Sequence, residues 1–209
     1  MKNKTIKIYD STLRDGAQTK GVSFSIDDKL RILDILMDIG VDYFEAGWPG
    51  ANPIDDELFK NLPAKFKSKV VAFGMMRKKN KSASNDPGLN AVLNSGVSTT
   101  CLVGKSWDFH VKSALRISNS ENLEMINDSI DYASTKLDEV MFDAEHFFDG
   151  YKSNPKYSLD VIKTAWNAGA KWIVLCDTNG GTLPYELSSI INDVKIIIPP
   201  ENLGVHFHN

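Results

Sequence analysis

Short runs of β-branched and aromatic residues alternate along the chain with longer segments in which apolar residues recur three and four positions apart. The short runs predict strands over Thr5–Tyr9, Val41–Ala46, Lys69–Phe73, Ser98–Val103, Glu139–Asp143, Lys171–Cys176 and Leu203–His208. The longer segments predict helices over Asp27–Ile39, Asp56–Leu62, Pro87–Asn94, Ser120–Leu137, Ser158–Ala168 and Pro184–Ile196. Because a helix separates successive strands, the strands are expected to pair in parallel through right-handed crossovers.

Local signals support these boundaries. Ser25 is expected to cap the first helix, and Pro184 suits the start of the last one, where its missing N–H costs nothing. Glycine follows three helical segments, at Gly40, Gly96 and Gly169. The polar stretch Arg77–Pro87 is predicted to be a solvated loop after the third strand.

Repeated strand–helix units without a glycine-rich dinucleotide turn after the first strand favour a TIM-type (β/α) barrel over a Rossmann sheet. The pattern supplies seven strands, so the expected fold is an incomplete α/β barrel of about seven parallel strands, in which the eighth unit is missing. The whole of residues 1–209 is interpreted as a single barrel domain.

Composition and charge narrow the class of protein. The chain has 24 basic and 27 acidic residues and a net charge of −3, which indicates no nucleic-acid or membrane-surface partner. The longest apolar runs are far shorter than the roughly 20 residues of a membrane span, and the lysine-rich start leads into a strand rather than a signal peptide. Cys101 and Cys176 lie in apolar runs and are expected to be reduced core residues of a cytoplasmic protein.

The residues that carry chemistry follow the predicted strands. In a (β/α) barrel the active site lies at the C-terminal ends of the strands. All four histidines of the chain, His110, His146, His206 and His208, fall at such ends. This asymmetry predicts an active site at that end of the barrel.

His206 and His208 are two residues apart on one strand, so their side chains share one face, while Val205 and Phe207 are expected to point outward to the helices. Two inward imidazoles can bind a divalent cation, and Asp15, in the turn after the first strand, is the natural third ligand. The alternatives are a hydrogen-bonded pair of core histidines and an ordinary turn aspartate.

Other polar residues at the strand ends also have two interpretations. Arg14 could pair with Glu45 and hold a fixed cation over the barrel mouth, or the pair could be a structural salt bridge. Glu145 and Thr178 could bind a small polar acid or cap the following helices. His146 stays ambiguous, since neighbouring strand residues face opposite ways.

Several long motifs in order resemble the DRE-TIM metallolyases, which include the isopropylmalate, homocitrate and citramalate synthases and the hydroxymethylglutaryl-CoA lyases. They are the segment from Asp10 to Gln18, the segment from Glu45 to Gly50, and the ending His206-x-His208-Asn209. The stretches Phe73–Gly74, Gly104–His110, Asp143–Tyr151 and Cys176–Pro184 look most like those of citramalate synthases.

The resemblance implies a Claisen-type condensation of acetyl-CoA with a 2-oxo acid, pyruvate, followed by thioester hydrolysis, in branched-chain amino-acid biosynthesis. The related 2-oxo acid synthases are the alternative, as is a non-catalytic fragment of such an enzyme. By the same resemblance Asp15, His206 and His208 are expected to hold a divalent metal (Mg, Mn or Zn). Arg14 and Glu145 are the expected catalytic residues. The residues expected around the 2-oxo acid are Arg14, Glu45, His110, Asp143, Glu145 and Thr178.

Relatives of this family continue after the His-x-His motif, so the resemblance implies that the chain is the N-terminal part of a longer synthase without its C-terminal domains. An open barrel would leave the backbone groups of Thr5–Tyr9 and Leu203–His208 unpaired at its edges. These edges could be covered by the rest of a longer chain or by a second copy in a homo-oligomer, most simply a dimer. Alternatively, Leu203–His208 could pair directly with Thr5–Tyr9 and close a distorted seven-stranded barrel.

Overall fold

Seven parallel strands follow one another in the sheet in chain order, β1 to β7. The computed structural model describes residues 6–208. Its strands are β1 (Tyr9–Asp10), β2 (Tyr43–Gly47), β3 (Val70–Met75), β4 (Thr99–Lys105), β5 (Glu139–Glu145), β6 (Trp172–Asp177) and β7 (Leu203–Phe207). This order is that of a (β/α) barrel, here incomplete, with seven strands among the described residues.

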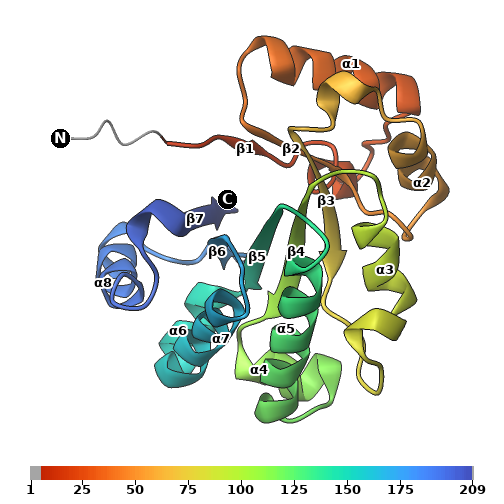
Figure 1. The fold of residues 1–209 in the computed structure, drawn as a ribbon. Helices are drawn as coiled ribbons and strands as arrows, with labels where there is room; N and C mark the ends of the chain where they lie inside the picture. Colours follow the sequence, from red (N-terminus) through yellow and green to blue (C-terminus); the bar gives the residue numbers. More distant parts are fainter. Residues whose placement is uncertain (1–5, 209) are drawn as a thin grey trace. The chain divides into compact units, whose positions relative to one another are not determined.

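Helices separate the strands (Figure 1). The α-helices are α1 (Ile26–Asp38), α2 (Pro53–Lys60), α3 (Pro87–Leu93), α4 (Asp108–His110), α5 (Asn119–Ser134), α6 (Phe147–Ser153), α7 (Pro155–Asn167) and α8 (Pro184–Val194). The shorter turns are η1 (Gly16–Gln18), η2 (Ala64–Phe66), η3 (Ala83–Asn85), η4 (Val111–Leu115) and η5 (Pro200–Asn202). Of these, η4 is a π-helical turn and the others are 3₁₀ turns.

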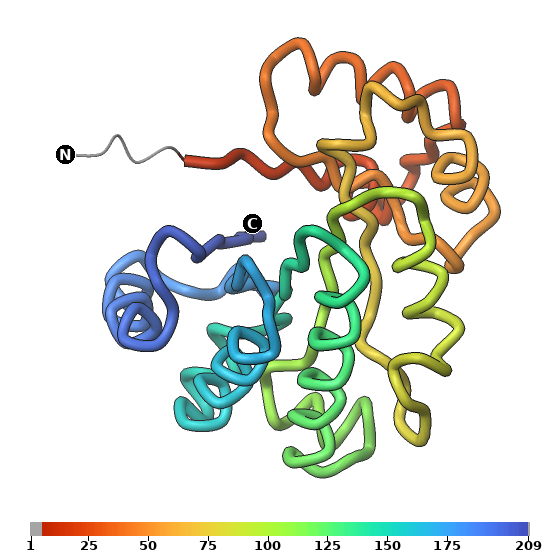
Figure 2. Tube along the Cα trace, in the orientation of Figure 1, coloured from red at the N-terminus to blue at the C-terminus, as the bar shows by residue number. Residues whose placement is uncertain are grey.

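The chain forms two compact units, which can be followed along the tube in Figure 2. Unit 1 comprises the residues up to Gly74 together with Pro87–Cys101, and unit 2 comprises Met75–Asp86 and the residues from Leu102 onward. The division falls within β3 and β4.

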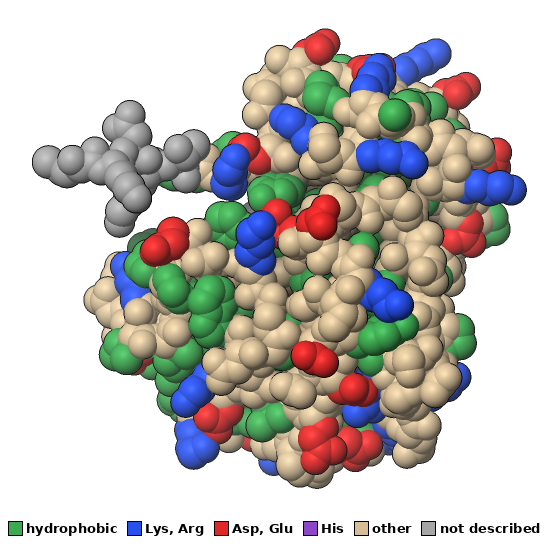
Figure 3. All heavy atoms as spheres, viewed as in Figure 1, with side chains coloured by type: hydrophobic (Ala, Val, Ile, Leu, Met, Phe, Trp, Pro, Cys, Tyr) green, Lys and Arg blue, Asp and Glu red, His purple; other side chains and the backbone are tan. Residues whose placement is uncertain are grey.

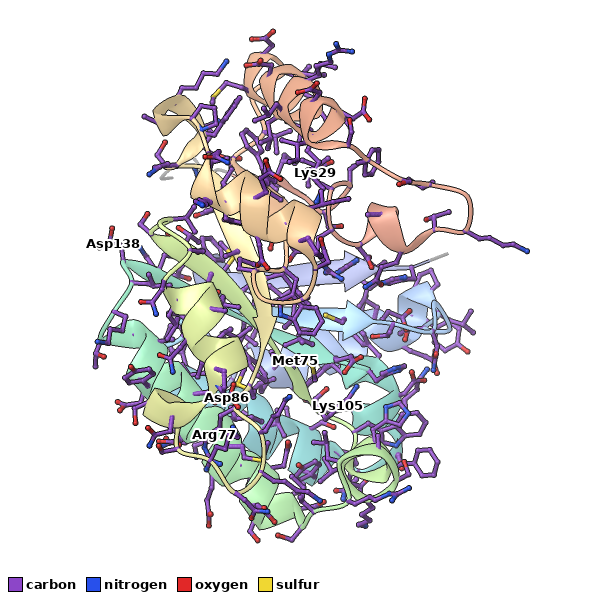
Figure 4. All side chains as sticks on the ribbon, turned by 90° about the vertical axis from the view of Figure 1, so that its right-hand side faces the viewer. Lys29, Met75, Arg77, Asp86, Lys105 and Asp138 are labelled. Atoms are coloured by element: carbon purple, nitrogen blue, oxygen red, sulfur yellow. The ribbon has the colours of Figure 1, made fainter. Side chains whose placement is uncertain are left out.

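Unit 1 is centred on β1, β2 and β3, which pair in parallel. Its apolar core includes the fully buried Leu33, Phe44, Leu58, Val71 and Val92. Among these apolar groups lies a charged one, Lys29 of α1, which is 3% exposed and extends toward α2 (Figure 4). Its Nζ donates to the carbonyls of Leu13 (3.0 Å) and Ala46 (2.8 Å) and to Asp55 Oδ1 (2.5 Å).

Unit 2 packs α5, α6 and α7 against β5 and β6. Phe142, Phe147 and Phe148 are fully buried there and form part of the core. Gly150 of α6 lies directly on the backbone after β4, because a Cβ at this position would come within 2.6 Å of the Ser106 carbonyl oxygen. The segment after β4 is therefore held tightly to the segment after β5.

Several local predictions are confirmed. Ser25 caps α1 in a capping box with Asp28, and Pro184 begins α8. Gly40, Gly96 and Gly169 have φ values of 84°, 83° and 106°, as residues that end helices in a left-handed conformation do. Cys101 and Cys176 are buried free cysteines.

Other boundaries were wrong. β4 and β5 each extend two residues beyond the predicted ends, through Lys105 and Glu145, because strand pairing overrides the polar character of those residues. β1 is limited to Tyr9–Asp10, and the predicted start at Thr5 lies outside the described residues. The helices α4 and α6 were missed, since each is a short segment within a loop after a strand.

The predicted loop Arg77–Pro87 is not simply solvated. It contains η3, its Asp86 is 2% exposed, and Asp86 accepts a hydrogen bond from the backbone N–H of Lys78 (Figure 4). Arg77 also pairs with Asp128 of α5, which ties the segment to that helix.

Val205 and Phe207 leave β7 on its outer face but remain 52% and 46% exposed. The ring of Phe207 does stack on Phe148 of α6, with centroids 5.8 Å apart, so the expected helix contact is made only in part. On the face drawn in Figure 3, basic and acidic side chains are interspersed. Within the described part of the chain, every helix is too short or too polar to cross a bilayer.

Replacing Lys29 by Met should destabilise the protein by about 3–5 kcal/mol, because Asp55 would keep a buried charge without its cation. Lys65→Met is the matched control: its partner Asp34 is exposed, so the change should cost at most about 1 kcal/mol. Urea denaturation followed by circular dichroism measures both. Equal effects of the two substitutions would contradict a structural role for the buried pair.

Candidate functional site

Parallel pairing places inward-facing side chains of β5, β6 and β7 in rows. The register aligns Asp143 with Val174 and Gly204, and Cys176 with His206. Because alternate residues share a face, Glu145 lies in the row of Cys176 and His206, one row further toward the strand ends than Asp143. Three neighbouring strands thus present acidic, thiol and imidazole groups on one face.

Glu145, the last residue of β5, pairs with Lys105, the last residue of β4. Its backbone carbonyl accepts hydrogen bonds from the Ser106 N–H (3.3 Å) and the Ser106 hydroxyl (2.6 Å). The carboxylate is 26% exposed and therefore remains accessible beside its cation. It does not cap α6, which has no side-chain cap, so the capping alternative is excluded.

His146 turns the chain out of β5 and into α6. Its φ of 55° and ψ of 35° are left-handed, an uncommon conformation for a residue with a side chain. In this conformation its backbone N–H donates to the Thr178 hydroxyl oxygen at 2.9 Å. The hydroxyl hydrogen of Thr178 is left to donate elsewhere, and Thr178 does not cap α8, which begins at Pro184.

The His146 ring packs against His110 of α4, with centroids 4.4 Å apart and planes at 82°, and both rings contact Trp107. Nδ1 of both histidines and Nε1 of Trp107 are buried and have no hydrogen-bond partner among the described residues. Burial lowers the pKa of His110 below 6.5, and the charges of His146 and Lys105 lower it further, against the smaller opposing effects of Glu145 and Asp149.

His206 and His208 of the β7 segment do share a face, as the sequence predicted. Their rings are stacked 4.7 Å apart with an interplanar angle of 21°. His206 is half-buried and His208 is exposed. Neutral imidazoles on an accessible face are a donor set that suits a divalent cation.

In unit 1, Arg14 is held from three sides. Its Nε pairs with Glu45, its Nη1 lies 3.2 Å from Asp15 Oδ1, and its guanidinium carbon lies 3.9 Å from the centroid of the Phe73 ring. The pair that the sequence suggested is therefore present. Phe73 was not predicted as a site residue, although it lies on the same face of β3 as Val71, the register partner of Glu45.

Glu45 is completely buried under Arg14. It also accepts a hydrogen bond from the Tyr9 hydroxyl at 2.5 Å. Burial raises the pKa of Glu45, and the Arg14 charge and the Tyr9 hydrogen bond offset only part of that effect. Glu45 therefore contacts both the Arg14 guanidinium and the Tyr9 hydroxyl.

The predicted site residues thus divide between the units. Unit 1 brings together Arg14, Asp15 and Glu45, and unit 2 holds His110, Asp143, Glu145, Thr178, His206 and His208. Sequence reasoning did not assign Tyr9, Phe73, Lys105 and His146, which orient the predicted residues. Lys105 and His146 lie in the segments Gly104–His110 and Asp143–Tyr151, which resemble the family motifs. Their positions at the ends of strands could have identified them as site residues.

Comparison with known proteins gives the family. The HMGL-like family model matches residues 5–209. The chain belongs to the HMGL-like family.

Curated relatives of this HMGL-like chain include synthases. It is 50% identical over 206 residues to a protein named (R)-citramalate synthase from Aquifex aeolicus (strain VF5). The alignment covers 98% of this chain and 39% of that protein. It is 30% identical over 207 residues to a 2-isopropylmalate synthase from Sulfolobus acidocaldarius, covering 99% and 51% of the two chains. The chain therefore spans about two fifths to one half of the length of these relatives.

The fold of the HMGL-like chain is shared with a crystal structure of the HMG-CoA lyase of Bacillus subtilis. The two superpose with a TM-score of 0.79 at 18% sequence identity, over 99% of this chain and 69% of the lyase chain. This similarity shows the fold and confirms the expectation of an incomplete barrel.

In this HMGL-like chain, the contact between His110 and His146 predicts how His110 titrates with pH. His110 should titrate below 6.5 in an NMR pH titration, and His146→Gln should raise its midpoint by removing the neighbouring charge. Since burial persists in that variant, the midpoint should stay below 6.5.

The same shift has a consequence for stability. Because the pKa of His110 is lower in the folded than in the unfolded state, this residue contributes stability at pH values above 6.5. That contribution is lost as the pH falls through the folded-state pKa. Denaturation of His110→Gln should show a smaller loss of stability over that window than wild type. An unchanged pH dependence would contradict the assigned environment of His110.

Proposed function

We propose that the protein containing this chain is a citramalate synthase, which condenses acetyl-CoA with pyruvate and hydrolyses the thioester. The observation that carries this proposal is the 50% identity over 98% of the chain with a curated (R)-citramalate synthase. The isopropylmalate synthase relative is only 30% identical, so a larger 2-oxo acid is the weaker alternative.

In this reaction a base accepts a proton from the methyl group of acetyl-CoA, and the methyl carbon forms a bond to the keto carbon of pyruvate. The π bond of the keto group breaks, its electron pair moves to the oxygen, and that oxygen gains a proton to become the hydroxyl of the product. Water then cleaves the thioester, which releases the CoA thiol. Negative charge develops on the former keto oxygen. A positively charged donor fixed in advance stabilises such charge strongly.

Arg14 is suited to that task. The Glu45 carboxylate, Asp15 and the Phe73 ring fix its guanidinium, so little reorganisation is needed when charge develops. Thr178 has a hydroxyl hydrogen to donate to the pyruvate carboxylate, because its oxygen already accepts from the backbone of His146. Glu145 serves as the catalytic carboxylate with Lys105 beside it, and His110 and Asp143 border the same site in unit 2.

Asp15, His206 and His208 are proposed to hold a divalent cation. One carboxylate and two stacked imidazoles form a donor set of the right chemistry for Mg, Mn or Zn. When bound, the cation polarises the keto oxygen and orients the 2-oxo acid. This chain's own contribution is to orient Asp15 through Arg14 and to present both imidazoles on one face of β7.

Turnover tests the proposal directly. The protein should release free thiol from acetyl-CoA only when pyruvate and a divalent cation are present, and faster than with 2-oxoisovalerate. Arg14→Lys should lower kcat by about 10²–10³-fold, because a lysine ammonium cannot reproduce the forked hydrogen bonds. The matched control is Arg31→Lys, on the exposed face of α1, which should retain wild-type turnover. Equal or better turnover with 2-oxoisovalerate would move the assignment to isopropylmalate synthesis.

Binding of the divalent cation can be measured independently of turnover. Titration calorimetry with Mn²⁺ should show one site in wild type and no measurable binding after His206→Ala plus His208→Ala. His110→Ala removes a histidine outside the proposed ligand set and should leave the isotherm unchanged. Identical isotherms for wild type and the double variant would exclude this site.

A further inference from the structure

Cys176 occupies a place in unit 2 that the proposed reaction does not use. It is the register partner of His206 on β7, so the two side chains lie next to each other on the same face of the sheet. Asp143 lies on the same face, one row deeper, because its register partner Val174 is two residues before Cys176. One ligand-bearing side chain therefore comes from each of three adjacent strands.

These three side chains are close enough to share an ion. A carboxylate oxygen of Asp143, the Sγ of Cys176 and a ring nitrogen of His206 all lie within 4.8 Å of one another. Asp143 is 6% and Cys176 is 5% exposed, whereas His206, in the same row as Cys176, is half-buried. A ligand would thus enter past His206 and be held by two buried groups.

The ligand chemistry selects a class of metal. A thiolate, a carboxylate and an imidazole together favour zinc-like, thiophilic cations, whereas Mg²⁺ prefers oxygen ligands. The Cys176 thiol contacts the Val174 carbonyl oxygen at 3.9 Å. Glu145, in the same row, is paired with Lys105 and is therefore left out of the ligand set.

We propose that Asp143, Cys176 and His206 form a binding site for a thiophilic divalent cation, which overlaps the site proposed for the catalytic cation at His206. On binding, the Cys176 S–H bond breaks, its proton goes to solvent, and the sulfur forms a bond to the metal, with no change in oxidation state. One further coordination position is open to water. Because His206 belongs to both ligand sets, the two cations exclude each other; this competition rests on the proposed function, whereas the site itself does not.

Cadmium is the probe, since Cd²⁺ bound to a thiolate gives an ultraviolet charge-transfer band that needs no activity. Titrating the reduced protein with Cd²⁺ should produce this band at one equivalent. Cys176→Ser should abolish it, and Asp143→Asn should raise the midpoint Cd²⁺ concentration by about tenfold or more. Cys101→Ser replaces the other buried cysteine, which falls in a separate candidate metal group, and should leave the band intact if Cys176 is the ligand.

Two further variants separate this site from the proposed catalytic one. Asp15→Asn removes a ligand of the catalytic cation only, so the band should persist, and Mn²⁺ should no longer shift the Cd²⁺ titration. His206→Ala should weaken the band in the absence of Mn²⁺. If a conservative variant fails to fold by circular dichroism, iodoacetamide protection of Cys176 by Cd²⁺ in wild type, located by peptide mass spectrometry, decides the same question.

A band that survives Cys176→Ser, or that is lost with Cys101→Ser, would overturn the proposed site. Equal alkylation of Cys176 with and without Cd²⁺ would overturn it as well. A band that behaves as expected but is unaffected by Mn²⁺ in wild type would leave the thiophilic site standing and contradict the shared use of His206 by a catalytic cation.

Discussion

Parallel pairing in fixed register is the constraint on which the polar clusters of each unit depend. In a parallel sheet every strand ends at the same edge, and alternate residues share a face. In unit 2 this puts Glu145, Cys176 and His206 in one row. In unit 1 it puts Tyr9, Glu45 and Phe73 on one face, around the guanidinium of Arg14. The register therefore decides which side chains meet, since a slip of one strand by one residue would turn its side chains to the opposite face. In unit 1 the β2–β3 register holds through Glu45 and shifts between Glu45 and Gly47.

Within unit 1 the loop that carries Arg14 depends on a buried charge. Lys29 binds the carbonyl of Leu13, next to Arg14, and the carbonyl of Ala46, next to Glu45. A single ammonium group thus fixes the backbone on both sides of the Arg14–Glu45 pair. Its own charge is balanced by Asp55, which also accepts from the Trp48 N–H and the Asn52 side chain.

Much of this arrangement could be predicted from sequence, because it depends on short-range patterns. Ser25 begins a helix through its own hydroxyl, and His206 and His208 share a face because strand residues alternate. The ends of β4 and β5 could not be predicted in this way. Lys105 and Glu145 are polar and look like loop residues, yet they continue their strands because they pair with each other across the sheet. The surroundings of the Arg14–Glu45 pair likewise could not be predicted from sequence. Phe73, which contacts Arg14, and Tyr9, which contacts Glu45, come from other parts of the chain.

The left-handed backbone at His146 limits how stable the protein can become. A residue with a side chain in this conformation costs the fold of the order of 1–3 kcal/mol, which glycine would largely avoid. Glycine would, however, remove the ring that packs on His110 and Trp107. Selection for thermal stability alone would therefore favour glycine or asparagine at this position, and selection for the ring opposes it. Position 146 is consequently one at which relief of backbone strain and packing of the ring oppose each other in engineering of this chain.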